Sequence, residues 1–308
     1  MKEGTLDRTD ISLLHILMRD SRASEQQMSE VLNITPRGVY LRTETLVREG
    51  VVRAMTAKPS LASLGAKSVL IYGRSRLRSM QHAMSMLSGE DSVAWIAQST
   101  GGRFYIAIHL KKDDDIDLAV QKTADRAMIA SPVAAIRELF DIAGEYNYST
   151  LDWRIVSSMS EDPRKSMEEV AAEIDEPLRR VVGRFNRMLE RNALDLSIEF
   201  DPNAISNPLC LFHMECFNKD RIVDTVQELM RRHAPSILFF NTYSNMPHMM
   251  TSLAVLQDLE ELRSVMRSFE ETECFDHIDA SLIIRSATMG TWRDKMVAIK
   301  GRPRALPQ

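Results

Sequence analysis

The sequence predicts an α+β fold built from two copies of one unit, in which three short helices precede a βαββαβ domain of the ferredoxin-like type. Three observations support this prediction: an internal repeat, apolar residues at helical spacing in two helix triplets, and the same order of strands and helices after each triplet. The 308 residues, 44% of them hydrophobic, are enough for at least two cores.

The repeat relates the two halves of the chain, since residues 10–53 align without a gap on residues 152–195, an offset of 142. Seven of these 44 positions are identical: Asp10/Asp152, Asp20/Asp162, Arg22/Arg164, Ser24/Ser166, Arg37/Arg179, Val39/Val181 and Arg42/Arg184. Apolar positions such as Leu14/Val156 and Leu46/Met188 also coincide, which preserves the core faces of three helices. We therefore interpret the chain as a tandem duplication.

Each unit opens with three helices whose ends carry capping signals. In the first unit we expect a helix capped by Asp7 and running to Arg19, a second over about Ser24–Leu32, and a third from Thr35-Pro36 to near Gly50. In the second unit we expect helices over about Asp152–Ser160, Ser166–Ile174 and Pro177–Arg191, the last capped by Asp175.

A βαββαβ order follows each triplet. In the first unit we expect strands at Ser68–Tyr72, Val93–Gln98, Phe104–Leu110 and Val133–Ile142, and helices at Leu77–Leu87 and Asp114–Met128. In the second we expect strands at Leu209–Cys216, Ile237–Thr242, His248–Leu256 and His277–Ile284, and helices at Asp220–Arg232 and Asp258–Phe269.

The overall charge gives little support to a nucleic-acid partner, because the formal net charge is -4 and the pI is about 6.0. No apolar run approaches the length of a membrane helix, and three cysteines without a C-x-x-C suit a reducing compartment. We therefore expect a cytoplasmic protein that does not bind membranes, and neither a zinc ribbon nor another metal site.

The third helix of each triplet is nevertheless locally basic. Arginines exceed acids by two in residues 35–48 and by four in residues 177–191. A helix triplet with a short second turn is typical of a helix-turn-helix, whose third helix lies in the DNA major groove, and arginine matches guanine and phosphate. The alternative is a solvated helix face, and the same placement in both copies favours DNA. The candidate DNA-contacting residues are Arg37, Arg42, Thr45, Arg48, Arg179, Arg180, Arg184 and Arg187.

The first half resembles the Lrp/AsnC, or feast/famine, family of transcription regulators. Residues 6–14 (LDRTDISLL), 28–36 (MSEVLNITP) and 46–52 (LVREGVV) are similar to successive motifs of that family, and Leu64-Gly65 precedes the first strand as expected. The second half resembles the family mainly through its register with the first. The resemblance implies winged helix-turn-helix units over 1–55 and 150–200, ferredoxin-like domains over 64–145 and 207–288, and a basic tail over 289–308.

The resemblance also implies function. We expect a DNA-binding transcriptional regulator that acts on double-stranded DNA as a covalent pseudo-dimer, on two unlike half-sites, and that assembles into a higher homo-oligomer. Thr100, Gly101 and Gly102 occupy the hairpin near which family members bind a small-molecule effector. This chain lacks the acidic residue that usually follows there, and has Arg103, Phe104 and Tyr105 instead.

An enzymatic branch of the family, the siroheme decarboxylases, provides the alternative function. Residues 104–109 (FYIAIH) loosely resemble a strand of these enzymes that ends in a histidine, but the insertion that precedes their strand is missing. Apart from His109, no residue pattern indicates catalysis, so we assign no catalytic residue, no metal and no cofactor. A third alternative is that the helix-turn-helix units bind protein.

Overall fold

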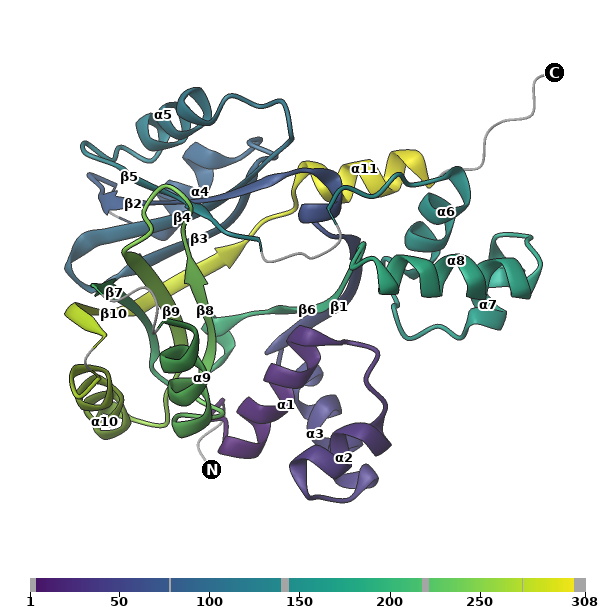
Figure 1. Ribbon diagram of the computed structural model, residues 1–308, viewed down its shortest axis with the longest axis horizontal. Helices are drawn as coiled ribbons and strands as arrows, with labels where there is room; N and C mark the ends of the chain where they lie inside the picture. Colours follow the sequence, from purple (N-terminus) through teal and green to yellow (C-terminus); the bar gives the residue numbers. More distant parts are fainter. Residues whose placement is uncertain (1–3, 78, 140–143, 218–221, 273, 302–308) are drawn as a thin grey trace.

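The computed structural model describes residues 4–77, 79–139, 144–217, 222–272 and 274–301. Two helix triplets lie on one side of an eight-stranded sheet and are linked to it by a two-stranded ribbon (Figure 1). Within the described ranges, no helix combines the length and the apolar character that crossing a bilayer requires.

The first triplet has the predicted form. It consists of α1 (Arg8–Arg19), α2 (Glu25–Leu32) and α3 (Pro36–Arg48). Asp7 and Ser24 each form a capping box, and the Thr35 hydroxyl accepts the Gly38 N–H at 3.1 Å. The apolar positions of the three helices meet in one core, in which Ile11, Leu14, Met28, Val39 and Leu46 are buried.

The second triplet repeats this arrangement with one difference. It consists of α6 (Thr150–Met159), α7 (Met167–Glu173) and α8 (Leu178–Glu190). The prediction that Asp175 caps the third helix is wrong. Pro177 is the N-cap residue, no side chain caps the helix, and Asp175 adopts a left-handed conformation with φ 49°.

The two βαββαβ domains follow the predicted order. The first comprises β2 (Lys67–Arg74), α4 (Met80–Leu87), β3 (Val93–Ser99), β4 (Arg103–Leu110), α5 (Ile116–Arg126) and β5 (Val133–Arg137). The second comprises β7 (Leu209–Cys216), α9 (Ile222–Arg232), β8 (Ile237–Thr242), β9 (Met249–Val255), α10 (Leu259–Glu270) and β10 (Phe275–Thr288). Positions 140–142 of the predicted fourth strand, and 220–221 of a predicted helix, lie outside the described residues.

The eight strands form one continuous antiparallel sheet in the order β5-β2-β4-β3-β10-β7-β9-β8. β10 extends to Thr288, beyond the predicted end at Ile284, because its C-terminal part pairs with β3 of the other domain. The outer strands β5 and β8 also approach each other, since Arg137 bridges to Tyr243 and the Glu138 N–H donates to the Thr242 carbonyl at 2.9 Å. The sheet therefore closes into a barrel, whose outer face is covered by α4 and α5 on one half and by α9 and α10 on the other (Figure 1).

A ribbon of two strands joins the triplets to the barrel. β1 (Val52–Pro59) and β6 (Leu194–Phe200) each follow a triplet and pair with one another in antiparallel register. The strand that leaves each helix-turn-helix unit is thus completed by the equivalent strand of the other copy. The two copies share this element as well as the barrel.

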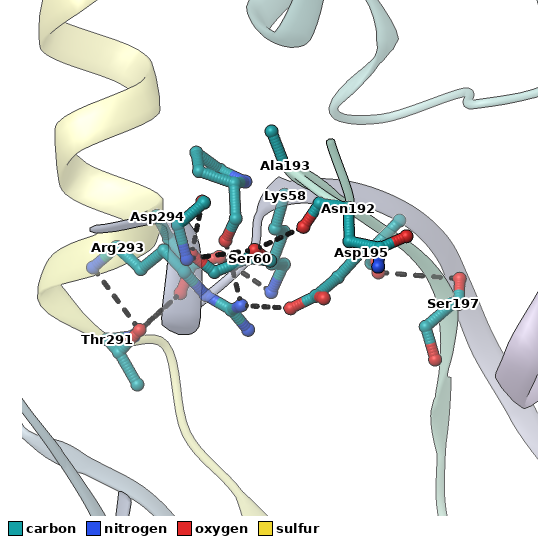
Figure 2. A network of polar contacts seen from close by, with 12 residues as sticks. Lys58, Ser60, Asn192, Ala193, Asp195, Ser197, Thr291, Arg293 and Asp294 are labelled. Atoms are coloured by element: carbon teal, nitrogen blue, oxygen red, sulfur yellow. Dashed lines mark hydrogen bonds and ion pairs between the residues drawn. The ribbon is translucent and has the colours of Figure 1, made fainter. Parts of the chain in front are cut away.

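The expected C-terminal tail is largely folded. Helix α11 (Trp292–Lys300) begins at a capping box formed by Thr291 and Asp294 and packs against α6 and β1, with Trp292 and Val297 buried. Figure 2 shows the polar contacts at its start, where Arg293 reaches the Pro59 carbonyl at 3.0 Å and Asp195 at 2.5 Å. The prediction of a tail that begins at residue 289 is therefore wrong for residues 292–300, which form α11. Positions 302–308 lie outside the described residues.

Candidate nucleic-acid interface

The two triplets contact each other through the same residue of each copy. Arg22 donates to the carbonyls of Pro163 and, at 2.9 Å, of Lys165. Arg164 donates to the Ser21 carbonyl at 2.9 Å and pairs with Glu25 at 3.2 Å. These reciprocal contacts relate the triplets by an approximate two-fold axis, so the spacing between α3 and α8 is fixed within one chain.

Two of the predicted DNA-contacting arginines lie in internal ion pairs. Arg42 contacts Asp10 at 2.6 Å and Asp7 at 2.9 Å. Arg184 contacts both carboxylate oxygens of Asp152, which is fully buried, and these hydrogen bonds raise the pKa of Arg184. The two pairs are equivalent under the repeat, and each holds the third helix of a triplet against the first.

Most of the other residues that are identical in the two copies also make contacts that stabilise the fold. Ser24 and Ser166 cap α2 and α7, and Val39 and Val181 are buried in the two cores. Asp20 and Asp162 each accept a backbone N–H two residues further on, at 2.9 Å. The remaining identical pair is Arg37 and Arg179, and both are exposed near the start of the third helix. The pair without a hydrogen bond or ion pair in the described residues is therefore the one exposed near the start of the third helix, the part that approaches DNA in helix-turn-helix proteins.

The outer face of α8 is basic and polar. Arg179, Arg180, Asn186 and Arg187 are exposed. Arg180 pairs with Glu176 at 2.8 Å, whereas Arg179 and Arg187 make no hydrogen bond or ion pair within the described residues. Two arginines of α8 therefore present free donors to the solvent.

Asn186 was not predicted as a site residue. An amide side chain can pair with adenine in the major groove. The signal in the sequence is its spacing, since Asn186 lies seven residues, or two helical turns, after Arg179.

The outer face of α3 is different. Arg37 lies over the ring of Tyr40, with its guanidinium carbon 5.1 Å from the ring centroid. Arg48 contacts the hydroxyl of the half-buried Thr45 at 3.3 Å, near the end of the helix. Tyr40, Leu41 and Val47 are 44–47% exposed. This face is less basic and more apolar than that of α8, so the two helices are chemically unlike.

The hairpin residues Thr100, Gly101 and Gly102 form one short turn between β3 and β4. Gly101 and Gly102 have φ values of 79° and 74°, which only glycine adopts readily, and a Cβ at either would meet no atom within 4 Å. The glycines therefore satisfy the geometry of the turn, and the effector role of these three residues stays a prediction.

His109 lies near the start of α11 and is half-buried, with its Nδ1 atom shielded from solvent. Its carbonyl accepts the Trp292 indole N–H at 2.8 Å, and its Nδ1 has no hydrogen-bond partner within the described residues. Burial, with the positive charges of Arg293 and Arg137, lowers the pKa of His109 to about 3. The ring is therefore neutral near pH 7 and poorly suited to proton transfer there. No group of three metal-ligating side chains comes together within the described ranges.

The comparisons agree with this arrangement of the first triplet. Residues 6–53 match the family model described as winged helix-turn-helix DNA-binding. An uncharacterized HTH-type transcriptional regulator of Pyrococcus abyssi is 30% identical over 112 residues, which cover 36% of this chain and 75% of the relative. The chain belongs to the Lrp/AsnC family of helix-turn-helix transcriptional regulators. Another relative, an uncharacterized HTH-type transcriptional regulator of Pyrococcus horikoshii, is 28% identical over 112 residues, again 36% of this chain and 75% of the relative.

A solved structure is similar over the whole chain. The crystal structure of the siroheme decarboxylase NirDL aligns with a TM-score of 0.60, covering 96% of this chain and 97% of that one, at 13% sequence identity. This likeness concerns the fold. The fold of this Lrp/AsnC chain is therefore similar to that of NirDL over nearly the full length of both chains.

Proposed function

We propose that this Lrp/AsnC chain is a DNA-binding transcriptional regulator whose α3 and α8 enter two major grooves of one DNA segment. The observation that carries the proposal is the pair Arg37 and Arg179, which are identical between the copies, exposed on the third helices and without an internal ion pair in the described residues. The reciprocal contacts of Arg22 and Arg164 support it, because they hold the two helices at a fixed spacing.

The residues divide by role. Arg179, Asn186 and Arg187 are proposed to read base edges from α8, and Arg37 to do so from α3. Arg180 and Arg48, which have acidic neighbours, are proposed to contact phosphates, with Thr45 beside Arg48. Arg42 and Arg184 position the helices through their aspartate pairs. Because the faces of α3 and α8 differ, the half-sites should differ too.

A mobility-shift titration of the full chain on promoter DNA tests this proposal. The double variant Arg179→Ala/Arg187→Ala should bind about 10- to 100-fold more weakly, because each lost base contact weakens binding by roughly tenfold or more. The matched control, Arg74→Ala/Arg267→Ala, removes two exposed arginines far from α3 and α8 and should change affinity less than about threefold. Equal affinity of wild type and Arg179→Ala/Arg187→Ala would contradict the proposal.

A second candidate function is tetrapyrrole decarboxylation, which the whole-chain likeness to NirDL favours. The lowered pKa and shielded Nδ1 of His109, the residue that this function would need, speak against it. Incubation with siroheme decides between the two. A new visible absorbance together with CO2 release would support the enzyme, whereas DNA binding without either would support the regulator.

Homo-oligomerisation of the pseudo-dimer and a small-molecule effector at Thr100, Gly101 and Gly102 complete the proposal. Sedimentation at micromolar concentration tests the first, and a monomer as the sole species would exclude it.

A further inference from the structure

The closed barrel contains a cavity of about 630 Å³, which we call the interior cavity. Its wall comes from the inward faces of the barrel strands, from both ribbon strands and from the start of α11. Its volume lies within the range of about 300–1,000 Å³ that is usual for small-molecule sites.

Arg137 is the most informative residue of this cavity. It ends β5 opposite Ser68, and both residues line the cavity. Its side chain is exposed, and it lines both this cavity and a second pocket that includes Lys67 and Ser244. Burial lowers the pKa of the Arg137 guanidinium.

Arg137 forms no direct ion pair within the described residues, although the negative charge of Asp195 in the same lining acts on it. Within the described residues its side chain makes no hydrogen bond or ion pair, and it lies over the ring of Phe239, whose centroid is 6.0 Å from the guanidinium carbon. A partly desolvated cation without a direct ion-pair partner is unfavourable, and an anion supplied from outside lowers that cost. The acidic residues of the lining have other direct partners: Glu199 pairs with Lys58 at 3.2 Å, and Asp195, whose charge also acts on Arg137, contacts Arg293 at 2.5 Å.

Further polar atoms of the lining also lack partners. The Asn241 Oδ1 and the Arg293 Nε are buried and have no hydrogen bond within the described residues. Unsatisfied hydrogen-bonding atoms of a guanidinium and an amide thus belong to residues of the lining, in addition to Arg137.

The rest of the lining is largely apolar. It includes Leu70, Trp95, Leu211, Phe239 and Leu253. Four basic residues, Arg19, Lys58, Arg137 and Arg293, face two acidic ones, so the formal charge of the lining is positive. A ligand that fits this cavity combines an anionic group with an apolar body.

We propose that the interior cavity binds an amphipathic organic carboxylate, whose carboxylate pairs with Arg137 and whose apolar body packs against Trp95 and Phe239. This site is separate from the DNA-binding helices and from the hairpin of Thr100, Gly101 and Gly102. The proposal goes beyond DNA binding and does not depend on it.

Calorimetric titration of the full chain, without DNA, tests the site with 2-naphthoate and dodecanoate as probes. At least one should bind one molecule per chain, and the neutral 2-naphthamide should bind at least about tenfold more weakly than 2-naphthoate, as a lost charge-assisted hydrogen bond predicts. Lack of saturable binding of both carboxylates up to millimolar concentration would overturn the proposal.

Substitutions of Arg137 test whether this residue binds the carboxylate. Arg137→Gln should weaken carboxylate binding at least about tenfold, whereas Arg137→Lys should weaken it less than Arg137→Gln does, because the positive charge is kept although the planar guanidinium is lost. Arg74→Gln, at the far end of β2, is the matched control and should bind as wild type does. Arg137→Gln should unfold at the same or a higher temperature, since it removes an unpaired charge, so weak binding would not reflect misfolding. Unchanged affinity in folded Arg137→Gln would also overturn the proposal.

Discussion

Arg184 and Arg187 lie three residues apart on α8 and have different surroundings. Arg184 pairs with the fully buried Asp152, whereas Arg187 is exposed. A charge count along the helix weighs the two equally, because the partner of Arg184 is 32 residues away in sequence. The sequence could therefore predict a basic third helix, whereas separating the arginines that pair internally from those that remain exposed required the tertiary contacts.

The two arginines should respond differently to truncation. Arg184→Ala leaves a buried carboxylate without its partner and should lower the free energy of unfolding by about 3 kcal/mol. Arg187→Ala should change it by less than about 0.5 kcal/mol, as is usual for an exposed side chain. Urea unfolding followed by circular dichroism measures both, and similar losses in the two variants would refute the division of roles.

His213 predicts a pH dependence of stability. Its ring packs against the rings of Tyr72 and Tyr105, and burial lowers its pKa to about 4. A histidine with a depressed pKa in the folded state favours folding fully above its unfolded pKa near 6.5, and this stability is lost as the pH falls from there toward 4.

Between pH 7 and pH 5, the protonation of His213 on unfolding should therefore lower stability by about 2 kcal/mol. His109, whose pKa is about 3, should act in the same direction. In His213→Gln, the loss over this interval should be smaller by roughly the same 2 kcal/mol. Denaturant titrations at the two pH values provide the measurement, and parallel losses in variant and wild type would exclude the buried neutral ring.

At the scale of elements, local patterns predicted the two triplets and the two βαββαβ orders, because helical spacing and strand alternation depend on neighbouring residues. The β1–β6 ribbon and the closure of the barrel were not predicted. Both pair segments far apart in sequence, such as Thr56 with Ser197 and Ser99 with Ile283. Residues 292–300 were interpreted as part of a tail because the segment is positively charged and contains Gly and Pro. The sequence did contain helix signals there: Thr291 and Asp294 form a capping box, and Trp292, Met296 and Val297 share a helical face.

Helix α11 should contribute to the stability of the second triplet, because Val297 belongs to its core. Val297→Ala should lower the free energy of unfolding by about 2 kcal/mol through lost apolar burial and the cavity left behind. Ile299→Ala is the matched control, since Ile299 is 69% exposed, and should cost less than about 0.5 kcal/mol. Thermal unfolding compares the two, and equal midpoints would mean that α11 is not docked in solution.

For the whole molecule, duplication within one chain has a direct consequence. A pair of identical subunits presents identical recognition helices, whereas this chain presents α3 with exposed Tyr40, Leu41 and Val47, and α8 with exposed Arg179, Asn186 and Arg187. The reciprocal arginine contacts and the shared ribbon hold these unlike faces at one spacing. The repeat was evident in the sequence, whereas the fixed spacing depends on contacts between the copies.

Recovery and sequencing of the genomic DNA fragments bound by the purified chain test the central claim most directly. We expect enriched fragments that contain two half-sites of different sequence, separated by about one helical turn of DNA or a multiple of it. Arg179→Ala/Arg187→Ala should relax the sequence at one half-site and leave the other unchanged. Recovery of fragments without enrichment over the input, or of sites with two identical half-sites that respond together to this variant, would contradict the account.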